Sequence, residues 1–249
     1  MSAAANLNPN PNLLELSGVH THIGAYHILH GVDLAVPLGQ LTMLLGRNGA
    51  GKTTTLRTIM GLWRASQGRI AFGGADITAL PTPAIARLNI AYVPENMGIF
   101  ADLTVQENLL LAARGASRAD RMDAQRLQWI FGMFPAVEKF WNHPAGKLSG
   151  GQKQMVAVAR AIVEPRDLLI VDEPSKGLAP AIIENMIAAF AQLKAGGTTI
   201  VLVEQNLGFA RRLGDRVAVM DNGRVVHAGG MAEFSADAAL QQSLLGLSL

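Results

Sequence analysis

Residues 41–54 read Leu41-Thr42-Met43-Leu44-Leu45-Gly46-Arg47-Asn48-Gly49-Ala50-Gly51-Lys52-Thr53-Thr54. The apolar run predicts a buried strand, and the glycines that follow predict a loop opening into a helix over 51–61. Together they match the phosphate-loop pattern G-x-x-x-x-G-K-[ST] in its required context of a strand before and a helix after. We therefore predict a nucleotide-binding α/β protein.

Each residue type in this loop has a chemical reason to be there. Glycines let successive N–H groups surround a phosphate at the positive end of a helix. Lys52 brings an ammonium to the terminal phosphates, and the hydroxyl of Thr53 is a suitable Mg²⁺ ligand. The residues expected to contact the nucleotide are Gly46, Arg47, Asn48, Gly49, Ala50, Gly51, Lys52, Thr53 and Thr54.

A second buried strand, Leu168-Leu169-Ile170-Val171, ends in Asp172 and Glu173. Ligands of open α/β sheets bind at the carboxyl edge of the strands. At that edge Asp172 is expected to hold Mg²⁺, and Glu173 to act as the general base that polarises the attacking water. An isolated acidic pair could equally cap a helix, so the phosphate loop is what favours catalysis.

Apolar segments at 13–19, 32–35, 41–45, 69–72, 90–93, 168–171, 199–203, 217–220 and 225–228 are expected as strands, with a hairpin turn at Asp221-Asn222-Gly223. Helical segments alternate with these strands, which predicts a mostly parallel sheet. The exceptions are an N-terminal β-rich part and about residues 96–159, where no strand is expected and helices dominate. We expect one domain over 13–249, with a core and β-subdomain from 13–95 and 160–249 and an inserted helical subdomain between them. Residues 1–12, rich in Asn and Pro, are expected to form a disordered tail.

The composition excludes several other classes of protein. The 249 residues carry 21 Lys and Arg against 19 Asp and Glu, include no cysteine and are 49% hydrophobic. This argues for a sizeable core and against disulfides, thiolate chemistry and a clustered basic surface for nucleic acid. No apolar run is long enough to span a membrane, and the start of the chain does not read as a signal peptide.

The stretch Leu148-Ser149-Gly150-Gly151-Gln152 lies shortly before the acidic strand end and opens a helix. Alone such a turn is common, but with the phosphate loop and Asp172-Glu173 the chain resembles the ATP-binding cassette (ABC) ATPases. The resemblance covers about residues 13–245. It implies ATP as ligand and Mg²⁺ as metal, and a second cradle made by Ser149, Gly150, Gly151 and Gln152 that closes on nucleotide held by another subunit.

Three further motifs resemble one branch of that family, the ATPases of branched-chain amino-acid importers: residues 92–95 (YVPE), 173–180 (EPSKGLAP) and 202–206 (LVEQN). By this resemblance Glu95 is a Mg²⁺ ligand, where the wider family has glutamine. Gln205 contacts the γ-phosphate and belongs to the catalytic set, where a histidine is usual. Ala179 replaces an aspartate, and Ile23 stands where an aromatic stacks on adenine.

The resemblance also implies the partners and the location. We expect an ATP-hydrolysing subunit of a bacterial importer, peripheral on the inner face of the inner membrane, with two permease subunits, a sister ATPase forming a homo- or heterodimer and, indirectly, an external substrate-binding protein. Nucleic acid is not expected. By the resemblance, residues 97–101 are expected near the permease, and Phe131, Phe134, Phe140 and Trp141 could line the same region, although core packing is the better interpretation for each aromatic taken singly.

Alternatives remain open at this point. The substrate could be urea or a short amide, and the site could be slow because Gln205 cannot carry a proton. A non-transport ABC ATPase would be expected to carry a coiled-coil insertion or a second cassette. A phosphate-loop kinase or GTPase would have no need of residues 148–152.

Overall fold

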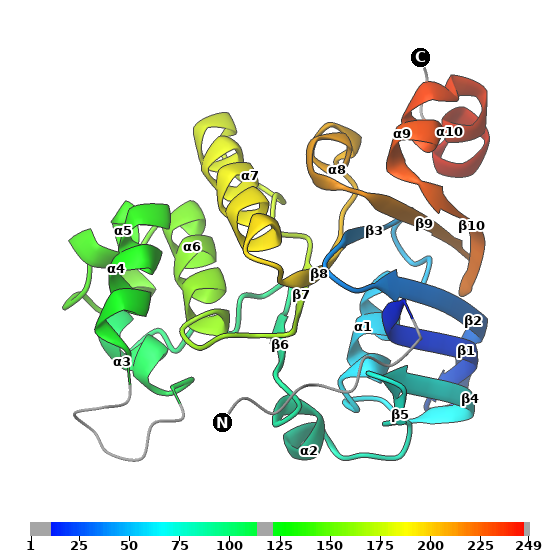
Figure 1. The fold of residues 1–249 in the computed structure, drawn as a ribbon, viewed down its shortest axis with the longest axis horizontal. Helices are drawn as coiled ribbons and strands as arrows, with labels where there is room; N and C mark the ends of the chain where they lie inside the picture. The colour runs from blue at the N-terminus through cyan, green and yellow to red at the C-terminus, as the bar shows by residue number, and fades with distance from the viewer. Residues whose placement is uncertain (1–10, 114–121, 247–249) are drawn as a thin grey trace.

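The computed structural model describes residues 11–113 and 122–246, and this part of the chain forms two β-sheets (Figure 1). One is antiparallel, with four strands in the order β2-β1-β4-β5; the other has six strands in the order β10-β9-β3-β8-β7-β6. The strands are β1 Asn12–Ile23, β2 Tyr26–Pro37, β3 Leu41–Gly46, β4 Ala65–Phe72, β5 Ala75–Asp76, β6 Ile90–Val93, β7 Leu168–Asp172, β8 Thr199–Val203, β9 Arg216–Asp221 and β10 Arg224–Gly230.

Helices lie in the longer connections between the strands and after β10, as Figure 1 shows. They are α1 Lys52–Ile59, α2 Thr82–Ala86, α3 Val105–Leu110, α4 Ala124–Met133, α5 Pro135–Lys139, the short 3-10 helix η1 Ala145–Lys147, α6 Gly150–Ala161, α7 Pro180–Ala195, α8 Leu207–Leu213, α9 Met231–Ala236 and α10 Ala238–Leu245. None of the helices within these described ranges is both long and apolar enough to cross a lipid bilayer.

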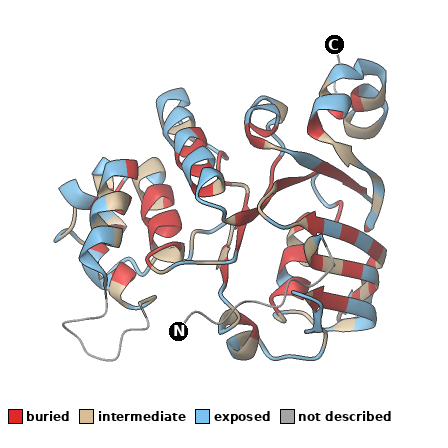
Figure 2. Ribbon diagram, viewed as in Figure 1, coloured by how far each residue is buried: buried red, intermediate tan, exposed pale blue. Residues whose placement is uncertain are grey.

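The six-stranded sheet is the centre of the molecule. All its neighbouring strands run parallel except β10, which pairs antiparallel with β9. Every residue of β3, β7 and β8 is buried, as the red strands of Figure 2 show. Because side chains alternate along a strand, the sheet contributes to two cores. Leu44 and Ile170 pack with α1 and the antiparallel sheet, whereas Met43 and Leu169 pack with the helices of the other face.

The predicted fold class is confirmed, and so are most of the predicted elements. The strands expected at 41–45, 90–93, 168–171 and 199–203 appear within one residue of those bounds. The turn expected at Asp221-Asn222-Gly223 joins β9 to β10, with φ of 45° at Asn222 and 73° at Gly223. Such positive values suit the tight turn of a hairpin.

Three features differ from the prediction. Strands β1 and β2 are longer than expected, because register shifts near Gly18 keep them paired over 12 residues each. Asn12, placed in the tail by the sequence, begins β1, while residues 1–10 of that tail lie outside the described residues. Helices α9 and α10 were not expected, since their mixed polar and apolar sequence carries no strong helical period.

Candidate functional site

The phosphate loop lies where β3 passes into α1 at the carboxyl edge of the central sheet. Its glycines are required by space as well as by backbone angle. Gly46 has φ 144°, and a Cβ there would lie 2.3 Å from the carbonyl oxygen of Met220. Gly51 has φ 103° and precedes α1, which has no side-chain cap among the described residues. The first N–H groups of α1 therefore remain suited to bind an anion.

Lys52 is held inside this loop. Its ammonium donates to the carbonyl oxygens of Gly46 (2.8 Å) and Arg47 (3.0 Å), and the residue is only 5% exposed. Burial lowers the pKa of Lys52, and the carboxylates of Glu173 and Asp172 act in the opposite direction. The side chain thus presents a fixed, partly desolvated positive charge, which strengthens its attraction for phosphate.

Asp172, the last residue of β7, presents a buried carboxylate beside α1. The residue is 1% exposed, and neither carboxylate oxygen has a hydrogen-bond partner of good geometry among the described residues. Burial raises the pKa of Asp172 to about 6, while the nearby hydroxyl of Thr53 acts to lower it. Two buried oxygens without partners next to a threonine hydroxyl fit the oxygen ligands that Mg²⁺ prefers.

Glu173 follows in a strained conformation, with φ of 50°. Its backbone N–H donates to the carbonyl oxygen of Val203 (2.9 Å), which fixes the residue to the end of β8. The side-chain amide of Gln205 donates both to the carboxylate of Glu173 and to Oδ1 of Asn48, the latter at 2.7 Å. Positive φ in a residue with a side chain is uncommon and clusters at functional sites.

On its other side Glu173 meets Lys176, whose ammonium lies 3.2 Å from its Oε2 and 2.6 Å from Oε1 of Glu95. Lys176 lies within the motif of residues 173–180, where the sequence predicted no role for it. Its spacing could have indicated the contact, because a lysine three residues after Glu173 can reach the Glu173 carboxylate when the chain turns between them.

A pocket of about 380 Å³ collects these groups. Its lining residues come from β2, the phosphate loop and α1, the end of β6 and the end of β7: Ile28, Asn48, Gly49, Gly51, Lys52, Thr53, Thr54, Glu95, Glu173 and Lys176. Ile23, the expected adenine contact, pairs with Tyr26 at the end of β1 and is half-buried outside this lining. Ile28 is the apolar side chain that lines the pocket instead.

The β9–β10 turn closes one side of the loop. The N–H of Gly223 donates to the carbonyl oxygen of Ala50, and the carbonyl oxygen of Gly223 accepts from the N–H of His30, both at 2.9 Å. A Cβ at Gly223 would lie 2.0 Å from the carbonyl oxygen of Ile28. Only glycine fits between the phosphate loop and β2.

The second predicted cradle lies at the start of α6 and does not line this pocket. Ser149 and Gln152 form a capping box: the Ser149 hydroxyl accepts from the N–H of Gln152 (3.3 Å), and Oε1 of Gln152 accepts from the N–H of Ser149 (2.9 Å). A Cβ on Gly150 would meet nothing within 4 Å, whereas one on Gly151 would lie 3.0 Å from Ile182 of α7. Ser149 and Gly150 are exposed.

The turn after Glu95 is attached to the same helix. Arg160 of α6 donates to the carbonyl oxygens of Gly98 (2.6 Å) and Met97 (3.0 Å), and its guanidinium lies 5.8 Å from the ring of Phe100. Phe100 is 53% exposed. Of the aromatics expected near a partner, Phe134 is fully buried and belongs to the core, which corrects that expectation for this residue.

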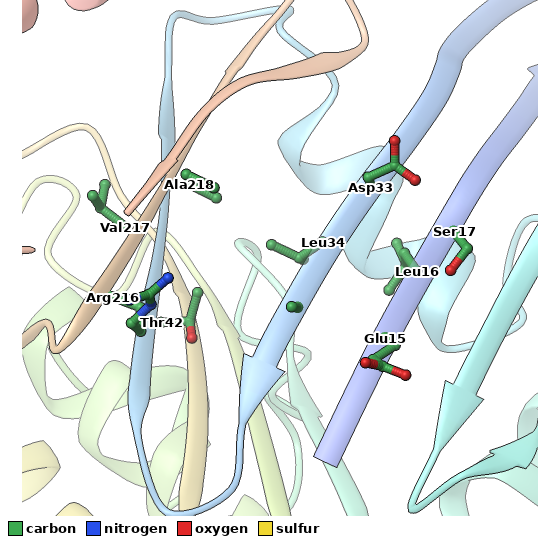
Figure 3. A pocket seen from close by; sticks show the side chains of 11 residues that line it. Glu15, Leu16, Ser17, Asp33, Leu34, Thr42, Arg216, Val217 and Ala218 are labelled. Carbon is green, nitrogen blue, oxygen red and sulfur yellow. The ribbon is translucent and has the colours of Figure 1, made fainter. Parts of the chain in front are cut away.

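A different pocket of about 390 Å³ lies between the two sheets, away from the phosphate loop (Figure 3). Leu16 and Leu34 contribute from the antiparallel sheet, and Thr42, Arg216 and Ala218 from the central sheet. None of the predicted site residues lines it. Its lining carries Glu15 and Asp33 and one cationic side chain, Arg216, but none of the glycines and lysines of the first pocket.

Comparisons with known proteins agree with this geometry. The family model described as ABC transporter matches residues 29–176. The high-affinity branched-chain amino acid transport ATP-binding protein BraG of Pseudomonas aeruginosa is 40% identical, over 86% of this chain and 91% of its own length. A probable branched-chain amino acid transport ATP-binding protein, LivF of Archaeoglobus fulgidus, is 35% identical over 89% and 93% of the two chains.

Solved structures show the same likeness. A dimeric post-hydrolysis ATP-binding cassette bound to ADP and Pi superposes with a TM-score of 0.78 at 27% identity, covering 88% of this chain and 98% of that one.

Proposed function

The chain belongs to the ABC transporter family of ATP-binding proteins, and on that premise we propose that it is the ATP-hydrolysing subunit of a bacterial importer for branched-chain amino acids. The branched-chain relatives BraG and LivF support this choice of substrate. One observation carries the chemistry: the phosphate loop, Glu95 and Glu173 line a single pocket, with Asp172 buried beside it.

The first half of the proposal is nucleotide binding by the loop of residues 46–54. Its backbone N–H groups and the start of α1 bind the phosphates, and Lys52 neutralises part of their charge. The carbonyl contacts of Lys52 hold its ammonium within reach of the loop. Ile28 and, at the end of β1, Ile23 are the apolar candidates for contact with the base.

Thr53, Asp172 and Glu95 are the residues that would hold Mg²⁺. The buried, unpartnered oxygens of Asp172 support this assignment. The metal, when bound, would neutralise charge that develops on the phosphates during transfer.

Hydrolysis requires a base and a group that orients the water. Glu173 is proposed to accept the proton as water attacks the γ-phosphorus and the bond to the leaving ADP oxygen breaks. The amide of Gln205 holds the Glu173 carboxylate from one side and reaches Asn48 of the phosphate loop on the other. Gln205 therefore acts as a neutral donor that fixes the base relative to the phosphates.

Ser149, Gly150, Gly151 and Gln152 are proposed to bind the nucleotide of a partner subunit. Their position at an exposed helix N-terminus outside the pocket supports a role in trans. ATP would then hold two cassettes together, and hydrolysis would release them. The partner is a sister ATPase or a second copy of this chain.

Transport requires the two permease subunits, and we propose that the exposed side of residues 97–101 contacts a permease at the inner face of the membrane. Phe100 is largely exposed there and Ile99 partly so. Ile99→Asp and Phe100→Asp are expected to abolish transport while leaving basal ATPase activity near the wild-type value. Loss of nucleotide binding in both variants would contradict this role.

The decisive experiment is isolation of the chain from native membranes in mild detergent, followed by identification of its partners. The proposal predicts two polytopic permeases and a second ATPase, and ATPase activity in the complex that a branched-chain amino acid with its binding protein stimulates. A lone homodimer, or co-purified nucleic acid, would overturn it.

A further inference from the structure

Lys176 stands on a tight turn that returns the chain over the predicted base. The N–H of Lys176 donates to the carbonyl oxygen of Glu173 (3.2 Å), and Gly177 continues the turn with φ of 69°. Within this turn, just before Lys176, the N–H of Ser175 donates to Oε1 of the buried Glu204 (2.9 Å). Because these hydrogen bonds fix the backbone of the turn, they also fix the position from which the Lys176 side chain extends.

The ammonium of Lys176 joins two carboxylates that come from different strands. It lies 2.6 Å from Glu95, which follows β6, and 3.2 Å from Glu173, which follows β7. The side chain of Glu173 is only 9% exposed, whereas those of Glu95 and Lys176 are 44% and 58% exposed. An ion pair between the exposed side chains of Lys176 and Glu95 alone would contribute little to stability. Lys176 also pairs with the nearly buried carboxylate of Glu173, whose position it fixes.

The balance of charges in the pocket indicates what the ion pairs of Lys176 with Glu95 and Glu173 do. The lining carries two lysines, Lys52 and Lys176, against Glu95 and Glu173, and Asp172 adds a third carboxylate beside Lys52. With Lys176 removed, Lys52 would be the one lysine of the lining left to offset these carboxylates and that of Glu204. The negative charge around Lys52 would then increase, which opposes the binding of a triphosphate, and the carboxylates of Glu95 and Glu173 would repel each other without a cation between them.

We propose that Lys176 is a positioning residue that works as a unit with Glu95: it offsets the charge of Glu95 and holds Glu173 in place. The inference rests on the proposed function, because it concerns the base and the nucleotide assigned there. It predicts functional coupling between two residues 81 positions apart in the chain.

The test is a double-mutant cycle on the full chain with Lys176→Met, Glu95→Gln and the double variant. Calorimetric titration with ATP and with ADP, both in EDTA, measures binding without hydrolysis. Lys176→Met should weaken ATP binding roughly five- to tenfold, and ADP binding less because ADP carries less charge. The double variant should recover most of the loss, since the unpaired carboxylate of Glu95 is gone.

Two further variants separate positioning from folding. Lys176→Arg keeps the charge and should bind ATP within about twofold of wild type. Lys194→Met removes a similar lysine that pairs with Asp215 at 2.9 Å elsewhere and should leave ATP affinity unchanged. Thermal melting of each variant shows whether a loss of affinity comes from unfolding.

The outcomes distinguish the inference from its premise. If the wild-type chain fails to bind ATP, the proposed function is wrong. If wild type binds ATP and Lys176→Met equals it, or if Glu95→Gln gives no recovery in a folded double variant, the role of Lys176 is wrong while the function stands.

Discussion

The starts of α1 and α6 are both helix N-termini suited to phosphate, yet the protein builds them differently. At α1, Gly51 offers no side-chain cap among the described residues, and Lys52, Asp172 and Glu173 surround the loop. At α6, Ser149 and Gln152 cap each other, and no carboxylate lines the tip among the described contacts. The first assembles charged groups from several strands, whereas the second is a neutral, exposed tip.

This difference indicates how the work is divided. The α1 site contains the groups that we propose bind the phosphates, hold a metal and accept a proton, so we assign the chemistry to this site. The α6 tip offers the uncharged polar groups of Ser149 and Gln152 and a surface without a side chain at Gly150. The tip can add contacts to a nucleotide that another subunit already holds, but it has too few groups to bind one alone. A dimer with nucleotide between its subunits requires such a surface.

The largest expected effect is at the α1 site. Glu173→Gln should lower the rate of phosphate release about 10²–10⁴-fold, because the amide cannot accept a proton. ATP binding should persist, and the variant should elute as a stable dimer with ATP on a sizing column. Glu184→Gln, at a surface ion pair with Arg212, is the matched control. An active Glu173→Gln variant would remove this residue from the role of base.

A second effect at the α1 site concerns stability. Burial raises the pKa of Asp172 from 3.8 to about 6, so its ionised form destabilises the fold above pH 6, and the penalty disappears as pH falls towards 4. The shift corresponds to about 3 kcal/mol. In EDTA, Asp172→Asn should therefore be more stable than wild type by about 1–3 kcal/mol at pH 8 and should lose this advantage by pH 4.

Urea denaturation at the two pH values measures this change. The same variant should lose the stabilisation that Mg²⁺ with ATP gives to the wild type. A variant that is less stable than wild type at pH 8 would show that the Asp172 carboxylate is not strained by burial.

At the α6 tip, Ser149→Ala should act on two levels. Loss of the cap should cost about 1 kcal/mol of stability. Affinity for ATP in the monomer should stay at the wild-type value, because the tip lies outside the pocket, whereas ATP-dependent dimerisation of the Glu173→Gln background should weaken. Analytical ultracentrifugation measures this. A drop in monomer affinity would place Ser149 in its own chain's site.

The smallest effect on folding is expected at Gly150. An added Cβ meets nothing in this chain, so Gly150→Ala should leave stability unchanged or raise it by about 0.5 kcal/mol. It should still weaken dimerisation, since a partner must approach the bare backbone. Gly151→Ala, whose Cβ would press on Ile182, serves as comparison and should destabilise the monomer instead. Normal dimerisation of Gly150→Ala would argue against the tip as a contact surface.

The sequence predicted which residues lie together around the start of α1 better than it predicted the contacts that link them across neighbouring strands. Glycines, a lysine and acidic strand ends at fixed spacing identify a phosphate site because local backbone geometry requires them. The bridge from Lys176 to Glu95 depends on β6 and β7 being neighbours, and the contact of Gln205 with Asn48 depends on β8 lying beside β3. Such pairings arise from the order of strands, which single residues do not encode.

The same reason explains Ile23 and Ile28. Both lie on one hairpin, and which of them reaches the pocket is decided by register shifts between β1 and β2. The helices α9 and α10 were missed for another reason: their burial comes from a few residues, such as Met231 and Phe234, and not from a continuous apolar stripe.

The placement of Gly223 has a mechanical consequence. Its two peptide groups tie the backbone of the phosphate loop to the backbone of β2, with no side chain between them. A rotation of the antiparallel sheet, which carries the proposed apolar contact for the base, would pull directly on the loop proposed to bind the phosphates. Movement at the base end of a bound nucleotide would then be coupled to movement at its phosphate end through the backbone hydrogen bonds of Gly223.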